Sequence, residues 1–172
     1  MTGRPEGLHY TEEDRGALLS RMDYTFEQLT ASDVGVLKDL LRVFGDAFED
    51  VETYQGAVPA DDYLRSLLAM PHFIVVVARR GRDVVGGLAA YELQKFERVR
   101  REIYIYDLAV AADHRRKGVA TGLIRELKRV AAERGAYVIY VQADKGDDPA
   151  IALYQGLGTR EDVYHFDFLV RD

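Results

Sequence analysis

Apolar and polar positions change their period in the middle of the chain, where a strand pattern gives way to a helix pattern. Residues Ile103 to Val110 are β-branched, aromatic or aliphatic except for one carboxylate, Asp107, which is the composition of a strand buried on both faces. From Val119 onward, apolar residues recur at three-and-four spacing while charged residues take the other side. The apolar positions are Val119, Ala120, Leu123, Ile124, Leu127, Val130 and Ala131. The pattern therefore predicts a central strand, a short turn and an amphipathic helix.

The same periodicities predict further elements on either side of this junction. The expected strands are Met22 to Phe26, Phe73 to Arg79, Val84 to Leu93, Tyr137 to Ala143 and Val163 to Val170. A charged linker, Gln94 to Glu102, is expected between the strand that ends at Leu93 and the central strand. The expected helices follow Ser32 or Asp33, follow Asp61 or Asp62, and run from Ala150 to Gly156. Three strands in succession favour an antiparallel meander, whereas the strand after the long helix should lie parallel to the central strand. The fold class is therefore α/β (α+β), a mixed central sheet flanked by helices, in which two neighbouring parallel strands splay apart.

Composition places the chain among ordinary globular proteins. It has 172 residues, of which 48% are hydrophobic and 30% charged, and a net charge of -6. This acidic balance argues against nucleic acid as a partner and is compatible with a cationic substrate. We expect residues 1–20 to form a flexible or peripheral extension and residues 21–172 to form one domain.

Cysteine content and hydropathy exclude several classes of protein. The chain has no cysteine, so a disulfide framework, a thiolate metal site and a cysteine nucleophile are all excluded, and we expect no metal. The first residues contain no apolar leader segment, and no apolar run approaches the roughly 18 residues of a membrane span. We therefore expect a cytoplasmic protein without a membrane partner.

The turn between the central strand and its helix has the chemistry of an anion site. Arg115, Arg116 and Lys117 precede Gly118, which allows close approach of the backbone, and the first N–H groups of a helix have no internal partner. The added positive charge favours a diphosphate over a lone carboxylate. A solvated basic turn is the alternative. The chain contains neither a P-loop nor a dinucleotide fingerprint after a strand, so the diphosphate would be held by a different turn.

This turn resembles the acetyl-coenzyme A motif of the GCN5-related N-acetyltransferases, [RQ]-x-x-G-x-[GA], with Arg115, Gly118 and Ala120 at the matching positions. The segments IYIYDLAV, GAYVIYVQADKGDDPAIALY and HFDF are similar to the aminoglycoside 3-N-acetyltransferases of the gentamicin-modifying type, and the similarity covers roughly residues 22–168. It implies the N-acetyltransferase fold, acetyl-CoA as cofactor and an aminoglycoside as substrate and partner. The residues expected at the cofactor are Leu108, Ala109, Val110, Arg115, Arg116, Lys117, Gly118, Val119, Ala120, Thr121 and Tyr154.

Acetyl transfer to an amine needs a base, a donor for the thioester oxygen and an acid for the departing thiolate. Asp107 is the candidate base because it interrupts an apolar strand, where burial raises the pKa of a carboxyl. A backbone N–H around Leu108 to Val110 is the candidate oxygen donor. Tyr154 is the candidate acid, as in the family it resembles. The alternatives are that Asp107 is a structural carboxylate, with the base in the Asp144 to Asp148 loop, and that Tyr154 packs in the core.

A set of carboxylates is expected to receive the ammonium groups of the polycationic substrate. They are Glu49, Asp50, Asp144, Asp147, Asp148 and Asp167. Asp147 departs from the wider family, in which many members have an asparagine at this position that contacts the pantetheine arm. A carboxylate there suggests contact with an amine instead. For Glu49 and Asp50 the alternative is a solvated acidic loop. His165 shares a face of the last predicted strand with Asp167, and the alternative to a role at the substrate is that it is a structural partner of these carboxylates.

Two other function classes fit the same cofactor turn. An N-acetyltransferase for a protein, a peptide or a small polyamine would share the cofactor site but need a different substrate groove. A non-catalytic acyl-CoA sensor would bind the cofactor without turnover. The preferred aminoglycoside, the native role and a homodimeric state are all left open by the sequence.

Overall fold

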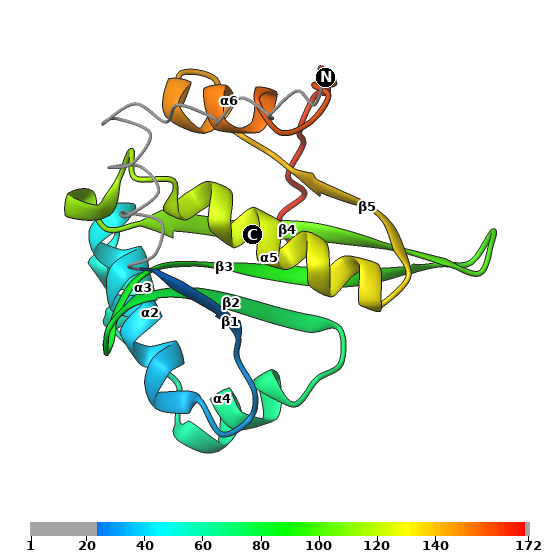
Figure 1. Ribbon diagram of the computed structural model, residues 1–172. Coiled ribbons are helices and arrows are strands. Elements are labelled where there is room, and N and C mark those ends of the chain that lie inside the picture. Colours follow the sequence, from blue (N-terminus) through cyan, green and yellow to red (C-terminus); the bar gives the residue numbers. More distant parts are fainter. Residues whose placement is uncertain (1–23, 171–172) are drawn as a thin grey trace, which may run out of the picture. The chain divides into compact units, whose positions relative to one another are not determined.

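The computed structural model describes residues 24–170, which form two compact units, one ending at Gln142 and the other beginning at Ala143. The predicted extension, residues 1–20, lies outside the described residues. The described part of the first unit contains a five-stranded sheet in the order β1-β2-β3-β4-β5 (Figure 1). Its strands are β1 (Thr25–Gln28), β2 (Phe73–Arg80), β3 (Asp83–Lys95), β4 (Arg100–Val110) and β5 (Ala136–Val141).

Strand directions confirm the predicted mixed sheet. Strands β1 to β4 form an antiparallel meander, and β5 lies parallel to β4. The last residue pair between β4 and β5 is Ile105 with Val141, although β4 continues to Val110. The two parallel strands therefore part at the C-terminal end of β4, which is the splay that the sequence predicts.

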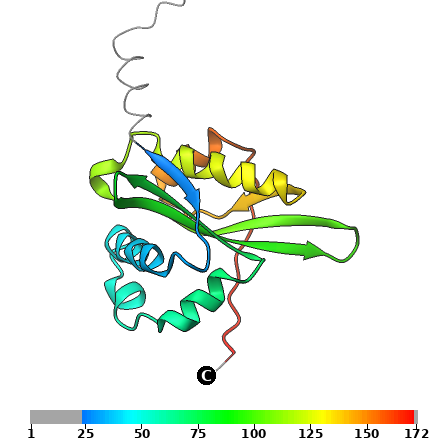
Figure 2. The same cartoon turned by 60° about the horizontal axis from the view of Figure 1, so that its bottom comes forward.

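Helices cover both faces of this sheet. One face carries α2 (Val34–Ala47) and α4 (Asp61–Leu68), and the other carries α5 (Val119–Glu133), as Figure 2 shows. Phe73, Val75 and Val77 of β2 belong to the buried cluster formed with α2 and α4. The alternate residues of β2 are buried as well, because α5 covers the opposite face. A strand covered on both sides has no polar face, which explains its continuous apolar run.

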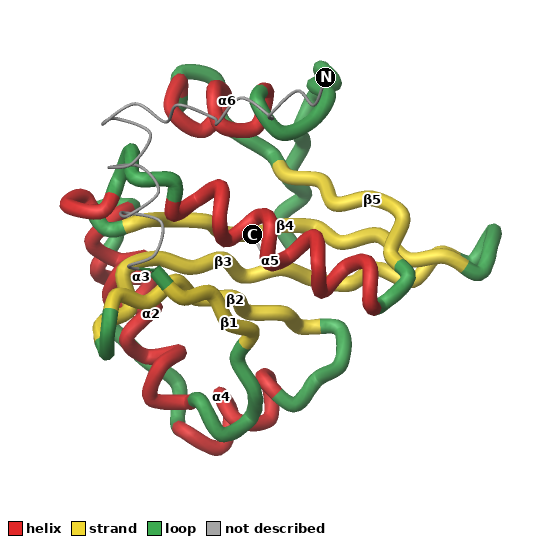
Figure 3. Tube along the Cα trace, in the orientation of Figure 1, coloured by secondary structure: helices red, strands yellow, loops and turns green. Residues whose placement is uncertain are grey.

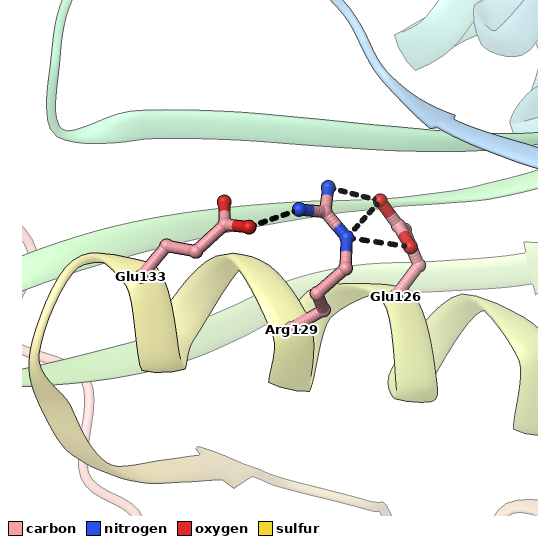
Figure 4. A network of polar contacts seen from close by, with 3 residues as sticks. All are labelled: Glu126, Arg129 and Glu133. Atoms are coloured by element: carbon pink, nitrogen blue, oxygen red, sulfur yellow. Dashed lines mark hydrogen bonds and ion pairs between the residues drawn. The ribbon is translucent and has the colours of Figure 1, made fainter.

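The predicted long helix is present as α5, and its apolar stripe is buried against the sheet. The buried residues are Val119, Leu123, Ile124, Leu127, Val130 and Ala131. On its outer side, Arg129 Nη2 donates to Glu126 Oε1 at 2.6 Å, and Arg129 also pairs with Glu133 one turn later (Figure 4). These i,i+3 and i,i+4 pairs hold charged side chains on the solvent face and support the helix locally.

Two expectations about the middle of the chain are wrong. The segment from Gln94 to Glu102, expected as a charged linker, lies mostly within the ends of β3 and β4, which form a long hairpin (Figure 3). Charge pairs explain this: Lys95 Nζ lies 3.6 Å from Glu102 Oε1 on the opposite strand. Strand β4 is also not buried on both faces, because Tyr106 is largely exposed.

The segment after α2 contains a helix that periodicity did not reveal, α3 (Val51–Gln55). Asp50 is its N-cap, since its carboxylate accepts a hydrogen bond from the backbone N–H of Thr53 at 3.1 Å. Asp33 does precede α2 as predicted, but its carboxylate accepts from the backbone and hydroxyl of Thr30 instead of from the helix. A helix of one turn is too short to show an apolar stripe.

The second unit contains α6 (Asp148–Gln155), close to the predicted range. The predicted strand from Val163 to Val170 is wrong, because no strand occurs between residues 143 and 170 of the described chain. Alternating apolar residues form a strand only where a neighbouring strand accepts their backbone hydrogen bonds. Within residues 24–170, no helix is both long and apolar enough to cross a membrane.

Candidate active site

The centre of the candidate site is the pair Asp107 and Tyr54. Asp107 lies on β4 opposite Ala89 of β3, at the register shift where β4 begins to part from β5. The Tyr54 hydroxyl of α3 donates to Asp107 Oδ1 at 3.1 Å. The ring of Tyr54 packs against Phe44 and Phe48, with ring centres 5.8 Å and 5.5 Å away. These rings anchor α3 to α2 and fix the phenol beside the carboxylate.

Burial dominates the acid–base properties of this pair. It raises the pKa of the Asp107 carboxyl, and the hydrogen bond from Tyr54 partly opposes that shift. The pKa of Tyr54 is raised by burial first and then by the charge of Asp107. Tyr54 therefore remains a hydrogen-bond donor at neutral pH, and Asp107 is a stronger base than an ordinary carboxylate. This environment suits a group that accepts a proton.

The end of β4 presents backbone beside this carboxylate. Leu108, Ala109 and Val110 pair with β3 on one side, but on the other side the ladder to β5 has already ended at Ile105. A strand that loses its neighbour exposes backbone groups on that edge, where an extended ligand can bind. Residues 108–110 therefore combine a backbone edge with the half-buried carboxylate of Asp107, one residue away.

Beyond β4, a short 3-10 turn (Ala112–His114) leads into the basic turn and α5. Gly118 is the N-cap of α5 in the left-handed region, with φ of 80°, and a Cβ placed there would meet no heavy atom within 4 Å. The first turn of α5 contains no acidic residue. The free N–H groups at the N-terminus of α5 can therefore be reached past Gly118, which suits the binding of an anionic group.

The three basic side chains of this turn take different positions. Arg115 Nε donates to the carbonyl of Val110 at 3.0 Å, and Lys117 Nζ donates to the carbonyl of Asp113 at 2.7 Å. The first bond ties the turn to the end of β4, and the second lies within the turn itself. Arg116 has a positive φ of 60°, a strained conformation for a residue with a side chain. Val119, Ala120 and Thr121 form the first turn of the helix itself.

The acidic residues after α2 are arranged as a helix start. Glu49 is exposed, with φ of 57°, and directly precedes the cap residue Asp50. Hydrogen bonding with Thr53, first through its side chain and then through its backbone N–H, lowers the pKa of Asp50, which remains exposed and charged. Because α3 also carries Tyr54, this acidic segment and the Tyr54–Asp107 pair belong to one local structure.

The remaining predicted residues lie in the second unit. Asp147 is the N-cap of α6 and accepts from the backbone N–H of Ala150 at 3.2 Å, while Asp148 occupies the first helical turn. Asp144 is exposed in the preceding loop. The pKa of Tyr154 on α6 is raised by burial and then by the charge of Asp147. Asp167 Oδ1 lies 2.9 Å from His165 Nε2, so these two side chains form a pair.

A mixed sheet with parting parallel strands, followed by a glycine turn at a helix N-terminus, defines the class of the protein. The chain belongs to the acetyltransferase (GNAT) family, whose sequence profile matches residues 37–159. Members of this family use acetyl-CoA as the acetyl donor.

Solved structures give the strongest similarities. An aminoglycoside acetyltransferase from an uncultured soil metagenomic sample is 54% identical, with a TM-score of 0.84, over 86% of this chain and 98% of the other. A second one from such a sample, in complex with sisomicin, is 31% identical, with a TM-score of 0.81, over 88% and 99% of the two chains. The N-acetyltransferase family 8 member 2 of Rattus norvegicus is 30% identical over 52% of this chain, a match that spans only 40% of the rat protein.

Sequence reasoning missed Tyr54 as a site residue. The sequence shows the charges of the nearby Glu49 and Asp50, but it does not show that Tyr54 contacts a residue 53 positions away. An aromatic residue one helical turn after a cap aspartate was the available signal.

The hydrogen bond between Tyr54 and Asp107 yields a direct test. In Tyr54→Phe we expect the pKa of Asp107 to rise above its value in the unchanged protein, because the bond that favours the ionised carboxylate is lost while burial remains. Carboxyl ¹³C shifts measured against pH, with Asp107→Asn to assign the resonance, report this pKa. Tyr63→Phe removes an exposed phenol on α4 and serves as the control. An unchanged or lower pKa in Tyr54→Phe would contradict the assigned contact.

Proposed function

We propose that this protein transfers the acetyl group of acetyl-CoA to an amino group of an aminoglycoside antibiotic, specifically the 3-amino group of the deoxystreptamine ring, and so confers resistance. The observation that carries the proposal is the half-buried Asp107 at the point where β4 and β5 part. The 54% identity to an aminoglycoside acetyltransferase supports the choice of substrate. A cytoplasmic location is part of the proposal, because the donor is a cytoplasmic metabolite.

The residues at the end of β4 and the start of α5 fit the donor. Bound acetyl-CoA supplies the acetyl group as a thioester. The N–H groups of residues 119–121 and the charges of Arg115, Arg116 and Lys117 hold its pyrophosphate, since no acidic side chain stands in the first turn. Gly118 keeps the approach open because it has no side chain.

The chain's own groups then handle protons and charge. Asp107 accepts the proton that the substrate amine must lose to become a nucleophile, directly or through water. A backbone N–H of Leu108 to Val110 donates to the thioester oxygen as it gains charge. The Tyr154 hydroxyl holds the proton that leaves with the thiol. Its raised pKa keeps it protonated but widens the gap to a thiol pKa of about 8.5, so this transfer is less favourable than for an unperturbed tyrosine.

Carboxylates of this chain hold the ammonium groups of the cationic substrate. They are Glu49, Asp50, Asp144, Asp147, Asp148 and Asp167. Each exposed pair with an ammonium group contributes only about 0 to 1 kcal/mol, so several must act together. Asp50 and Asp147 also cap helices, and a cap uses one carboxylate oxygen and leaves the charge in place. His165 orients Asp167 within this set.

The alternatives are acetylation of a protein, peptide or small polyamine, and acyl-CoA sensing without turnover. The proposed function is tested by steady-state release of coenzyme A with gentamicin, kanamycin, spermidine and a lysine peptide as acceptors. We expect turnover with the aminoglycosides at the highest kcat/KM. Preference for the peptide or for spermidine would favour the first alternative, and binding of acetyl-CoA without turnover would favour the second.

Asp107→Asn should fold and bind acetyl-CoA normally, since an amide still accepts the Tyr54 hydrogen bond, but its turnover should fall by about a hundredfold or more. A base acts only when ionised, so activity falls as pH falls through the pKa of Asp107. That acidic limb should disappear in the variant. A variant of unchanged melting temperature that keeps the limb and near-normal turnover would make Asp107 structural and move the base to the Asp144 to Asp148 loop.

Gly118→Asp should weaken acetyl-CoA by about tenfold or more, because it places a carboxylate at the positive end of α5. Gly81→Asp is the matched control: Gly81 also has a positive φ, 62°, in open space, but lies in the β2–β3 turn. The control carries the same kind of backbone strain and should leave affinity unchanged by calorimetry. Equal affinities of the two variants would remove the turn from the cofactor site.

Asp147→Asn tests charge separately from capping, because asparagine caps a helix as well as aspartate does. Combined with Asp148→Asn, it should raise the KM for the aminoglycoside by about threefold to tenfold and leave the KM for acetyl-CoA nearly unchanged. Asp162→Asn removes an exposed charge from the same unit, where Asp162 pairs with Arg160, and is the control. Parallel increases in both KM values would mean that the loop has a structural role.

A further inference from the structure

Four tyrosines form a continuous aromatic surface across β3, β4 and β5, close to Asp107. We call Tyr91, Tyr104, Tyr106 and Tyr140 the tyrosine wall. Tyr106 meets Tyr91 and Tyr104 edge to face, with ring centres 6.1 Å and 6.0 Å apart. Tyr104 stacks on Tyr140 with centres 5.0 Å apart. Of the eleven tyrosines in the chain, these four come from three neighbouring strands and touch in series.

The backbone explains why these rings gather there. The register between β3 and β4 shifts at Ala89 and Ala90, which pair with Asp107 and Ile105 and leave Tyr106 as the extra residue of a bulge. Tyr104 and Tyr140 are direct partners in the parallel ladder, one pair before it ends. The bulge and the end of the ladder thus place the wall at the splay.

Most of the wall lies outside the core, although Tyr91 packs against the buried cluster that includes Phe73. Tyr106 is 65% exposed and Tyr140 is 40% exposed, whereas Ile103 and Ile105, on the other face of β4, are at most 2% exposed. The hydroxyl of Tyr104 donates to Gln142 at 3.0 Å, which fixes its ring without covering it. A contiguous exposed aromatic surface beside a half-buried acid is typical of a ligand site.

Charge and ring chemistry identify the ligand class. Burial is the first cause that raises the pKa values of Tyr91, Tyr104 and Tyr140, so their phenols stay neutral. Neutral phenol rings attract cations over their faces and pack against the C–H face of a saturated ring. Asp107, which directly follows Tyr106 on β4, adds a negative charge beside the wall. A saturated ring that carries an ammonium group matches both features.

We propose that the tyrosine wall binds one amino-sugar ring of the substrate by stacking and cation–π contact and thereby delivers the ring's amine to Asp107. The proposal rests on the proposed aminoglycoside acetylation and adds a different source of selectivity. Carboxylates alone attract any polycation, including a linear polyamine. The wall favours a polycation built of rings.

The composition of the chain supplies a binding probe, because it contains no tryptophan. Tyr106→Trp keeps an aromatic face in the wall and introduces a single tryptophan. Addition of gentamicin, without acetyl-CoA, should shift its emission to shorter wavelength as the ring excludes water, and spermidine should shift it far less. Phe96→Trp is the control: Phe96 is fully exposed at the β3–β4 turn, about 20 Å or more along β4 from Asp107. Its emission should respond to neither compound.

Kinetics provide an independent measurement. Tyr106→Leu and Tyr140→Leu should each raise the KM for gentamicin by roughly threefold, while the KM values for spermidine and for acetyl-CoA stay unchanged. Phe96→Leu, which removes a still more exposed aromatic ring far from the wall, should change none of these. Because both wall residues are exposed, we expect the variants to fold, and Tyr106→Trp tests the wall in any case.

The results separate the wall from the proposed function. Two results together would overturn the proposed role of the wall and leave aminoglycoside acetylation intact. They are a Tyr106→Trp emission that gentamicin does not shift and an unchanged KM for gentamicin in both leucine variants. A response to acetyl-CoA instead of gentamicin would assign the wall to the donor and also overturn the proposal. Failure of the unchanged protein to acetylate any aminoglycoside would overturn the proposed function, whereas a gentamicin-dependent emission shift would still support the wall.

Discussion

The burial of α5 against the sheet is the constraint on which the site depends. Its apolar stripe, from Val119 to Ala131, is buried against the sheet, where α5 contacts all five strands. A helix that starts at the end of β4 and packs back across the sheet returns the chain to the start of a parallel neighbour, β5. This packing fixes the N-terminus of α5 beside the end of β4.

The opposite face of the sheet holds Asp107 and its hydrogen-bond partner. Aromatic packing of Phe44, Phe48 and Tyr54 attaches α3 to α2, and the Tyr54 hydroxyl then reaches Asp107 on β4. Two features of the structure therefore set the pKa of Asp107. Burial is one of them, and the hydrogen bond from Tyr54 of α3 is the other. The two effects shift its pKa in opposite directions, and burial is the stronger. Loss of either the burial or the hydrogen bond would change the pKa of Asp107.

Two aspartates cap a helix and also carry a negative charge, so a substitution must be chosen that changes only one of these properties. Asp50 and Asp147 each cap a short helix with a bond to the backbone N–H three positions later. Alanine at these positions would remove a cap and a charge together, at a cost of about 1 kcal/mol in helix stability. Asparagine keeps the cap and removes only the charge. Substitutions with equal capping ability therefore separate recognition of the substrate from local folding.

The sequence by itself determined the elements whose signal is local: the helix from Val119, the meander of strands, the parallel strand after the helix, and the glycine turn between strand and helix. Periodicity and turn chemistry depend on residues close together in the sequence, so they can be recognised without knowledge of the fold. Tertiary structure decided the rest. Strand pairing turned the expected linker after Leu93 into a hairpin, and the segment from Val163, despite its alternation, found no neighbouring strand within the described residues. The Tyr54–Asp107 bond and the tyrosine wall join positions far apart along the chain, and such contacts arise only when packing brings separate elements together.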